Sequence, residues 1–148
     1  MRIEETIRQW YEIAAGHPVS NANAFFRFMA VWMAFNALYA SRHSYCSGDN
    51  KQVQAFASEH EAIEEHLRLL EVDPTYLRKV LDLSEEPIGG LLGKVQILDV
   101  RKLPQVCEAL YQVRCNLFHG GKQLSNERDE MLVEASCYIV SRLIEPYL

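Results

Sequence analysis

The stretch FFRFMAVWMAFNALYA, residues 25–40, decides the fold. Its apolar residues recur at steps of three and four, which is the spacing of one face of an α-helix. A helix with so apolar a face is predicted to lie at the centre of the core. The stretch is interrupted by Arg27 and Asn36 and is shorter than the roughly 18 clean apolar residues that span a membrane, so no membrane span is predicted. The face consists of Phe25, Phe28, Met29, Trp32, Phe35, Asn36 and Tyr39, broadened by Phe26, Met33 and Ala37.

Amphipathic patterns on both sides of this stretch predict further helices. They cover residues 3–15, about 20–45 for the central helix, 52–71, 74–83, 104–118 and 126–145. No segment shows the pattern of a strand, and residues 84–94, SEEPIGGLLGK, are predicted to be either a surface connector or an active-site lid. The sequence therefore predicts an all-α protein with one domain, residues 1–148, built as an antiparallel four-helix bundle with additional short helices.

The charge distribution limits the kind of ligand this protein binds. Apolar residues make up 49% of the chain and charged residues 24%, which is typical of a globular domain. The formal net charge of −5 argues against binding nucleic acid along the whole surface. Residues 94–122 nevertheless hold five basic and two acidic side chains, so this block is where a local anion site is predicted.

The four cysteines indicate a reducing compartment. Cys46, Cys107, Cys115 and Cys137 form no CxxC pair, and most lie in apolar helical runs. They are expected to be buried reduced thiols in a cytoplasmic protein. The first residues carry acids and no apolar run, so no signal peptide is expected.

Residues 60–64, HEAIE, raise the question of a metal site. His60 lies on the inner face of the predicted helix 52–71 and shares that face with Glu64. The string is not the HExxH zinc motif, and no ExxH repeat completes a dimetal site. A solvated acidic face is the favoured interpretation, and no metal or cofactor is predicted.

The candidate catalytic residues lie in the stretch VRCNLFHGGK, residues 113–122. Arg114 and His119 are five positions apart and would not share a face of an unbroken helix. Gly120 and Gly121 permit the bend that brings the two side chains together. A fixed guanidinium binds phosphate oxygens and an imidazole transfers protons near neutral pH, so the pair suits phosphate chemistry. The alternative is that both cations only satisfy open carbonyls at a helix end.

This stretch resembles the signature of the HEPN family, an arginine and a histidine separated by four to six residues at the end of a bundle helix. Here four residues separate Arg114 from His119. The apolar helix is similar to the second long helix of some HEPN branches, so the resemblance spans most of the chain. One branch carries a modified tyrosine two positions after the histidine, where this chain has Gly121.

The resemblance implies a homodimer with a composite cleft and metal-independent cleavage of RNA, often by toxins or defence effectors. Arg114 would hold the scissile phosphate, and His119 would act as general base or acid on the ribose 2′-hydroxyl or the leaving oxygen. The family usually places a polar residue directly after the arginine, whereas here Asn116 stands one position later. Asn116, Asn36 and Lys122 are the candidate supporting residues.

Other interpretations remain open. Some HEPN members are not nucleases, so the chain is alternatively a non-catalytic module that binds RNA, a nucleotide or a protein partner such as a nucleotidyltransferase-like antitoxin. A third interpretation is a dimerisation domain in which Arg114 and His119 only terminate a helix. Asn36 either fixes helix register as a buried amide or orients a side chain of the site.

Overall fold

In this computed structural model the described residues are 3–16, 21–118 and 127–148. They form seven α-helices and one small β-hairpin, so the predicted all-α class is confirmed in its main feature. A turn of 3₁₀-helix, η1 (Glu145–Tyr147), follows the last helix. The helices are α1 (Ile3–Gly16), α2 (Asn21–Arg42), α3 (Asp49–Ala57), α4 (His60–Val72), α5 (Pro74–Ser84), α6 (Leu103–Phe118) and α7 (Glu127–Ile144).

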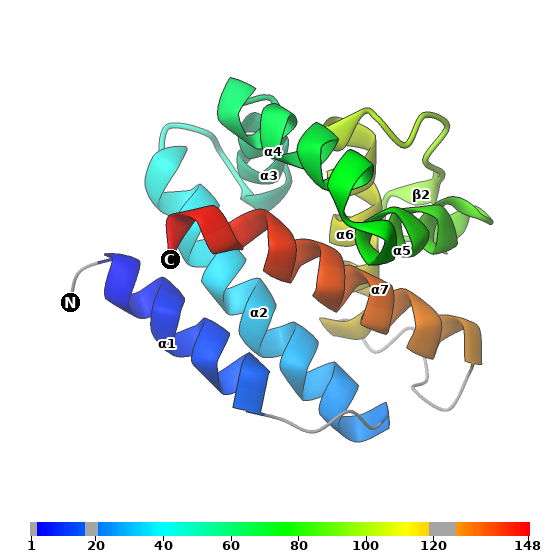
Figure 1. Cartoon of the computed structure of the whole chain (residues 1–148), viewed down its shortest axis with the longest axis horizontal. Coiled ribbons are helices and arrows are strands. Elements are labelled where there is room, and N and C mark those ends of the chain that lie inside the picture. The colour runs from blue at the N-terminus through cyan, green and yellow to red at the C-terminus, as the bar shows by residue number, and fades with distance from the viewer. Residues whose placement is uncertain (1–2, 17–20, 119–126) are drawn as a thin grey trace.

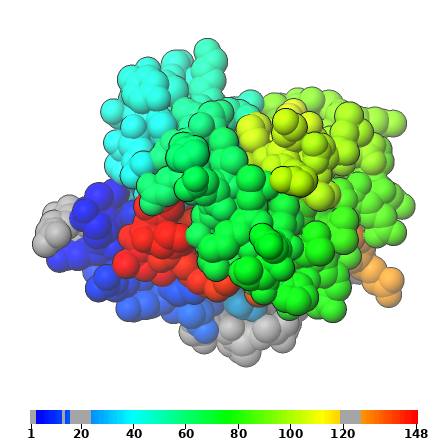
Figure 2. Space-filling view, turned by 45° about the horizontal axis from the view of Figure 1, so that its top comes forward, coloured from blue at the N-terminus to red at the C-terminus, as the bar shows by residue number. Residues whose placement is uncertain are grey.

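The helices pack around α2 and α7. Figure 1 shows α1 and α2 side by side and antiparallel, with α7 lying between this pair and α5. On the other side of the core α6 packs against α3. The face seen in Figure 2 is formed largely by α4 and α5, with the segment that follows the hairpin beside them. Among the described residues, no helix combines the length and the apolarity that crossing a membrane requires.

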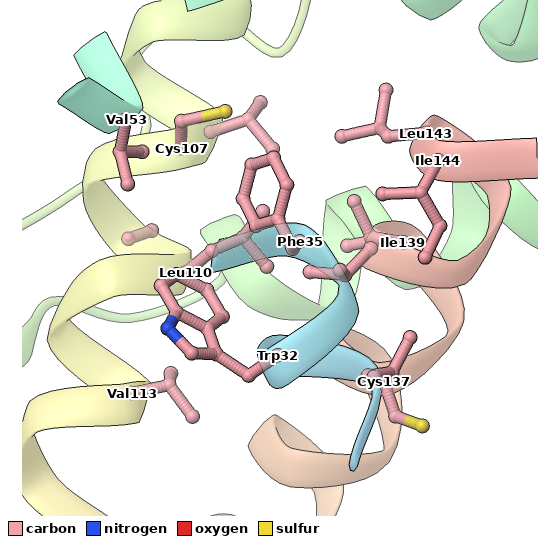
Figure 3. Packing of buried hydrophobic residues seen from close by; sticks show 14 of the residues in the cluster. Trp32, Phe35, Val53, Cys107, Leu110, Val113, Cys137, Ile139, Leu143 and Ile144 are labelled. Carbon is pink, nitrogen blue, oxygen red and sulfur yellow. The ribbon is translucent and has the colours of Figure 1, made fainter. Parts of the chain in front are cut away.

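The aromatic face of α2 forms the centre of the core. Phe35 is fully buried, and its ring centroid lies 5.2 Å from that of Trp32, 5.0 Å from Tyr39 and 5.2 Å from Phe56 of α3. These edge-to-face arrangements are the favourable geometry for aromatic pairs. Figure 3 shows Trp32 and Phe35 surrounded by aliphatic side chains of α6 and α7, so α2 is the central helix that its sequence predicts.

The prediction that Phe26 and Met33 broaden this buried face is wrong. Phe26 is 53% exposed and Met33 is 40% exposed. At about 100° per residue, Phe26 lies roughly 200° around the helix from Phe28, so it points away from the core. Met33 lies on the same outer side, and α2 therefore carries an exposed apolar strip opposite its buried face.

The predicted helix over residues 52–71 is two helices, α3 and α4, which are separated at Ser58 and Glu59. Glu59 is extended, with φ −69° and ψ 136°. Its carboxylate accepts hydrogen bonds from Arg42 and from His43, the latter at 2.6 Å, at the C-terminal end of α2. These contacts come from a distant part of the chain, so the local pattern does not contain them. As a result the side chain of His60 is 86% exposed and does not face the core.

A β-hairpin replaces part of the predicted loop over residues 84–94. Strands β1 (Ile88–Gly90) and β2 (Gly93–Val95) pair antiparallel, and Gly93, the first residue of β2, has φ +83°. The buried amide of Gln112 in α6 holds the hairpin, because its Nε2 donates to the carbonyls of Ile88 (3.1 Å) and Gly93 (2.6 Å). Its Oε1 accepts from the backbone N–H of Leu92 at 3.1 Å. Three backbone groups thus find their partners in one side chain.

We expect Gly90→Ala to lower the free energy of unfolding by about 1–3 kcal/mol through overpacking. A Cβ at position 90 would lie 2.2 Å from Asn116 Oδ1 and 2.9 Å from Gln112 Cδ. Both amides are held by hydrogen bonds to the hairpin and have little freedom to move. Urea unfolding of the variant measures the change. The matched control is Gly89→Ala, whose Cβ would meet nothing within 4 Å, and equal destabilisation by both variants would contradict this account.

His66 is a buried histidine of α4 that is held in its neutral form. Its ring nitrogens lie 2.7 Å from the hydroxyl of Tyr76 (Nδ1) and 2.8 Å from the carbonyl oxygen of Val100 (Nε2). A carbonyl only accepts, so Nε2 carries the proton and Nδ1 accepts from the tyrosine. Burial lowers the pKa of His66, against the hydrogen bond to Val100, which raises it.

This lowered pKa predicts a stability that falls with acidification. The unfolded chain binds a proton at His66 below about pH 6.5, while the folded protein resists doing so. The contribution to stability is therefore complete above that pH and declines as the pH falls below it. The free energy of unfolding can be measured with urea at several pH values between 5 and 8. It should change less with pH for His66→Gln than for the wild type. Identical slopes would contradict the assignment.

Candidate functional site

Arg114 lies near the end of α6, four residues before Phe118, the last residue described in that helix. Its side chain is 21% exposed. The guanidinium carbon lies 4.5 Å from the ring centroid of Phe118 and 5.7 Å from that of Tyr111. These cation–π contacts hold the guanidinium in a defined position at the edge of the core.

The guanidinium is only partly paired. Nη2 lies 3.6 Å from Oδ2 of Asp49, and Nη1 lies 4.0 Å from the sulfur of Cys115. Nε is buried and has no hydrogen-bond partner among the described residues. Because a guanidinium carries five N–H donors, most of this donor capacity is unused in the part of the chain described here.

Asp49, the first residue of α3, connects Arg114 with Asn36. The Nδ2 atom of Asn36 donates to the hydroxyl of Tyr39 at 2.9 Å and to Oδ1 of Asp49 at 3.4 Å. The other carboxylate oxygen of Asp49 faces Arg114. Two residues predicted from the sequence, Asn36 and Arg114, therefore lie on either side of a carboxylate that the sequence did not single out.

Arg114, Asp49 and Asn36 form a cluster with the aromatic residues Tyr39, Tyr111 and Phe118. The tyrosines of this cluster stay neutral. Burial raises the pKa of Tyr39 well above its ordinary value, with Asn36 and Arg114 opposing and Asp49 reinforcing the shift. Burial also raises the pKa of Tyr111. The charged groups of the cluster are therefore the ion pair of Arg114 and Asp49, whose opposite charges balance.

Asn116 does not face this cluster. It lies two residues after Arg114, roughly 200° around the helix, and is 9% exposed. Its Nδ2 donates to the carbonyl of Gly89 at 2.8 Å, so it holds the hairpin one turn beyond Gln112. His119 and Lys122, the remaining predicted site residues, lie outside the described residues.

No group of three or more His, Cys, Asp or Glu side chains placed to hold a metal occurs within residues 3–16, 21–118 and 127–148. His60 and Glu64 form a 2.8 Å pair, with side chains 86% and 67% exposed. Such a pair in water contributes little to stability and offers a metal only two ligands.

This arrangement is suited to binding one anionic oxygen group. A phosphate oxygen next to Nη2 would replace the long contact with Asp49 by a charge-assisted hydrogen bond, and the other guanidinium N–H groups provide further donors. The two aromatic rings fix the guanidinium before any anion arrives, which reduces the entropic cost of binding.

The chain was compared with protein-family models, with curated proteins and with solved structures. None of the three comparisons gives a significant match.

Proposed function

We propose that this protein is a metal-independent endoribonuclease of the HEPN type, in which Arg114 and His119 act on one phosphate. The observation that carries the proposal is the position of Arg114, fixed by two rings near the end of α6 and only weakly paired, with His119 five residues later in the sequence. The four longest described helices, α1, α2, α6 and α7, would form the bundle of such a fold.

The proposed reaction is an attack within the RNA strand itself. His119 as general base takes the proton from a ribose 2′-hydroxyl, and the oxygen attacks the adjacent phosphorus. The bond from phosphorus to the 5′-oxygen breaks, and that oxygen takes up a proton from water as it leaves. The products are a 2′,3′-cyclic phosphate and a 5′-hydroxyl. Arg114 stabilises the negative charge that builds on the non-bridging oxygens.

The exposed strip of α2 supports a dimer around this site. Phe26 and Met33 are large, apolar and exposed, and Asn36 borders the same outer side of the helix. Through Asp49 the strip is continuous with the surroundings of Arg114. A second copy packed on this strip, with the two-fold axis next to Arg114, would form one composite site from two Arg114 side chains. Because three of the four free thiols are buried, we propose the cytoplasm as the location.

The test is cleavage of RNA by the purified protein in EDTA. We expect the wild type to cut single-stranded RNA and His119→Ala to lose about 100-fold or more of the rate, because general acid–base catalysis contributes about that much. His60→Ala is the matched control, since His60 is exposed and lies in α4. Equal cutting by the wild type and His119→Ala, or no cutting by either, would remove the proposal.

A non-catalytic binding module is the second candidate function. The observation that favours it is Asp49, whose carboxylate faces Arg114 and balances its charge, on a chain with a net charge of −5. On this account the protein binds RNA, a nucleotide or a protein partner such as an antitoxin without cutting RNA. Binding of RNA without any cleavage would favour the module over the nuclease.

A further inference from the structure

A cavity of about 360 Å³ lies between α1, α2, α5 and α7, and none of its lining residues belongs to the cluster around Arg114. Its volume falls within the range of small-molecule sites. Figure 1 shows why these helices meet here, since α7 lies between the α1–α2 pair and α5. Three basic side chains line the cavity, Arg27 from α2, Lys79 from α5 and Arg142 from α7.

Two carboxylates hold Arg142 at the wall of the cavity. Its Nη1 donates to Oε2 of Glu145 at 2.6 Å, and its Nε lies at the ion-pair distance of 3.2 Å from Oδ2 of Asp73 without forming a hydrogen bond among the described residues. The hydroxyl of Tyr138 donates to the same oxygen of Asp73 at 2.8 Å. Asp73 also caps α5, because its Oδ1 accepts from backbone N–H groups of the first turn. This network joins α5 to α7, and it leaves Arg142 little charge to offer a ligand.

Arg27 and Lys79 have fewer partners than Arg142 among the described residues. The Nε of Arg27 donates to the carbonyl of Ala14 in α1 at 3.2 Å, and both residues line the cavity. Its terminal nitrogens and the ammonium of Lys79 have no partner within the described ranges 3–16, 21–118 and 127–148. Two unpaired cations from different helices at one half-buried cavity favour an anion there.

The other lining residues limit what this anion is. Glu134 also lines the cavity, so the cavity disfavours a ligand with several negative groups. Burial raises the pKa of the Cys137 thiol, Arg27 opposes that shift and Glu134 reinforces it, so both charges act on the same part of the cavity. Ala15 and Ala24 are small and apolar, and they leave space on the side of α1 and α2.

We propose that this cavity binds a small organic anion, with one carboxylate or phosphate between Arg27 and Lys79 and a compact apolar body against the alanines of α1 and α2. The inference does not depend on the proposed nuclease function. The cavity shares no residue with the Arg114 cluster, so either proposal can fail without the other.

The experiment is an NMR titration of the ¹⁵N-labelled protein with benzoate, phenyl phosphate, inorganic phosphate and benzyl alcohol. We expect saturable shifts of α1, α2, α5 and α7 amides with benzoate or phenyl phosphate, and the tighter of the two identifies the anionic group. Benzyl alcohol, which lacks the charge, should bind at least about tenfold more weakly. Inorganic phosphate, which lacks the apolar body, should also bind more weakly.

Charge variants give the decisive comparison. The double variant Arg27→Gln with Lys79→Gln should weaken anion binding about tenfold or more, while Lys94→Gln in β2 should leave it unchanged. Glu134→Gln should tighten binding about threefold, a gain that misfolding cannot imitate. Failure of both organic anions to bind the wild type would overturn the proposal, as would equal affinity for the double variant.

Discussion

Arg114→Ala is expected to lower the rate of RNA cleavage about 100- to 1,000-fold, the cost of removing one preorganised donor from an oxyanion site. Two aromatic rings position the guanidinium, and the substitution removes every N–H donor that this side chain offers to a phosphate. The loss should appear mainly in kcat, because the charge that Arg114 stabilises grows in the transition state.

Two variants separate this role from a general effect of charge. Arg114→Lys keeps the charge but loses the planar fork, and it should recover only part of the rate. Arg101→Ala removes an exposed cation from the same basic block and should leave kcat unchanged. Circular dichroism and thermal unfolding show whether each variant is folded. A folded Arg114→Ala protein that cleaves at the wild-type rate would exclude Arg114 from catalysis.

Phe35→Ala is expected to lower the free energy of unfolding by about 3–5 kcal/mol, the range found when a buried phenylalanine is truncated. Phe35 is fully buried and contacts three other aromatic rings at centroid distances of 5.0 to 5.2 Å. Those rings come from both α2 and α3, so the cavity cannot close by moving one helix. The loss is a large share of the roughly 5–15 kcal/mol that stabilises a typical domain.

Urea unfolding followed by circular dichroism measures this loss. Leu98→Ala is the control, because Leu98 is 84% exposed and its truncation should change the free energy by less than about 0.5 kcal/mol. Phe35→Leu keeps most of the volume and should fall between the two. A loss below about 1 kcal/mol for Phe35→Ala would mean that α2 is not the centre of the core.

Sequence reasoning predicted the helices whose signals are local. The predicted helix 74–83 is α5, which starts at Pro74 because Asp73 caps its first turn. The apolar face of α2 is continuous through Phe28 and Phe35. The separation of α3 from α4 could not be predicted, because Glu59 leaves the helix to pair with residues at the end of α2. The hairpin was missed for the same kind of reason, since its partner is a side chain of α6.

The residues of the candidate site could also be predicted only where their signals are local in the sequence. Arg114 was identified by its motif and Asn36 by being polar within an apolar face, and the structure places them near each other. Asp49 was missed because the segment CSGDNK, residues 46–51, has the composition of a turn and gives no sign that its aspartate reaches α6. The preceding Gly48, with φ +93°, turns the chain into α3, but the direction of this turn is not visible in the sequence. Asn116 could be assigned to the hairpin only once Gly89 was seen beside it.

The amide of Gln112 has a mechanical consequence for Arg114, two residues away in α6. Any rotation of this helix about its long axis would have to break three hydrogen bonds to the hairpin together. The hairpin therefore resists rotation of α6 about its long axis. The guanidinium therefore has the same orientation before an anion binds. Its N–H donors are already directed at the position that the anion will occupy.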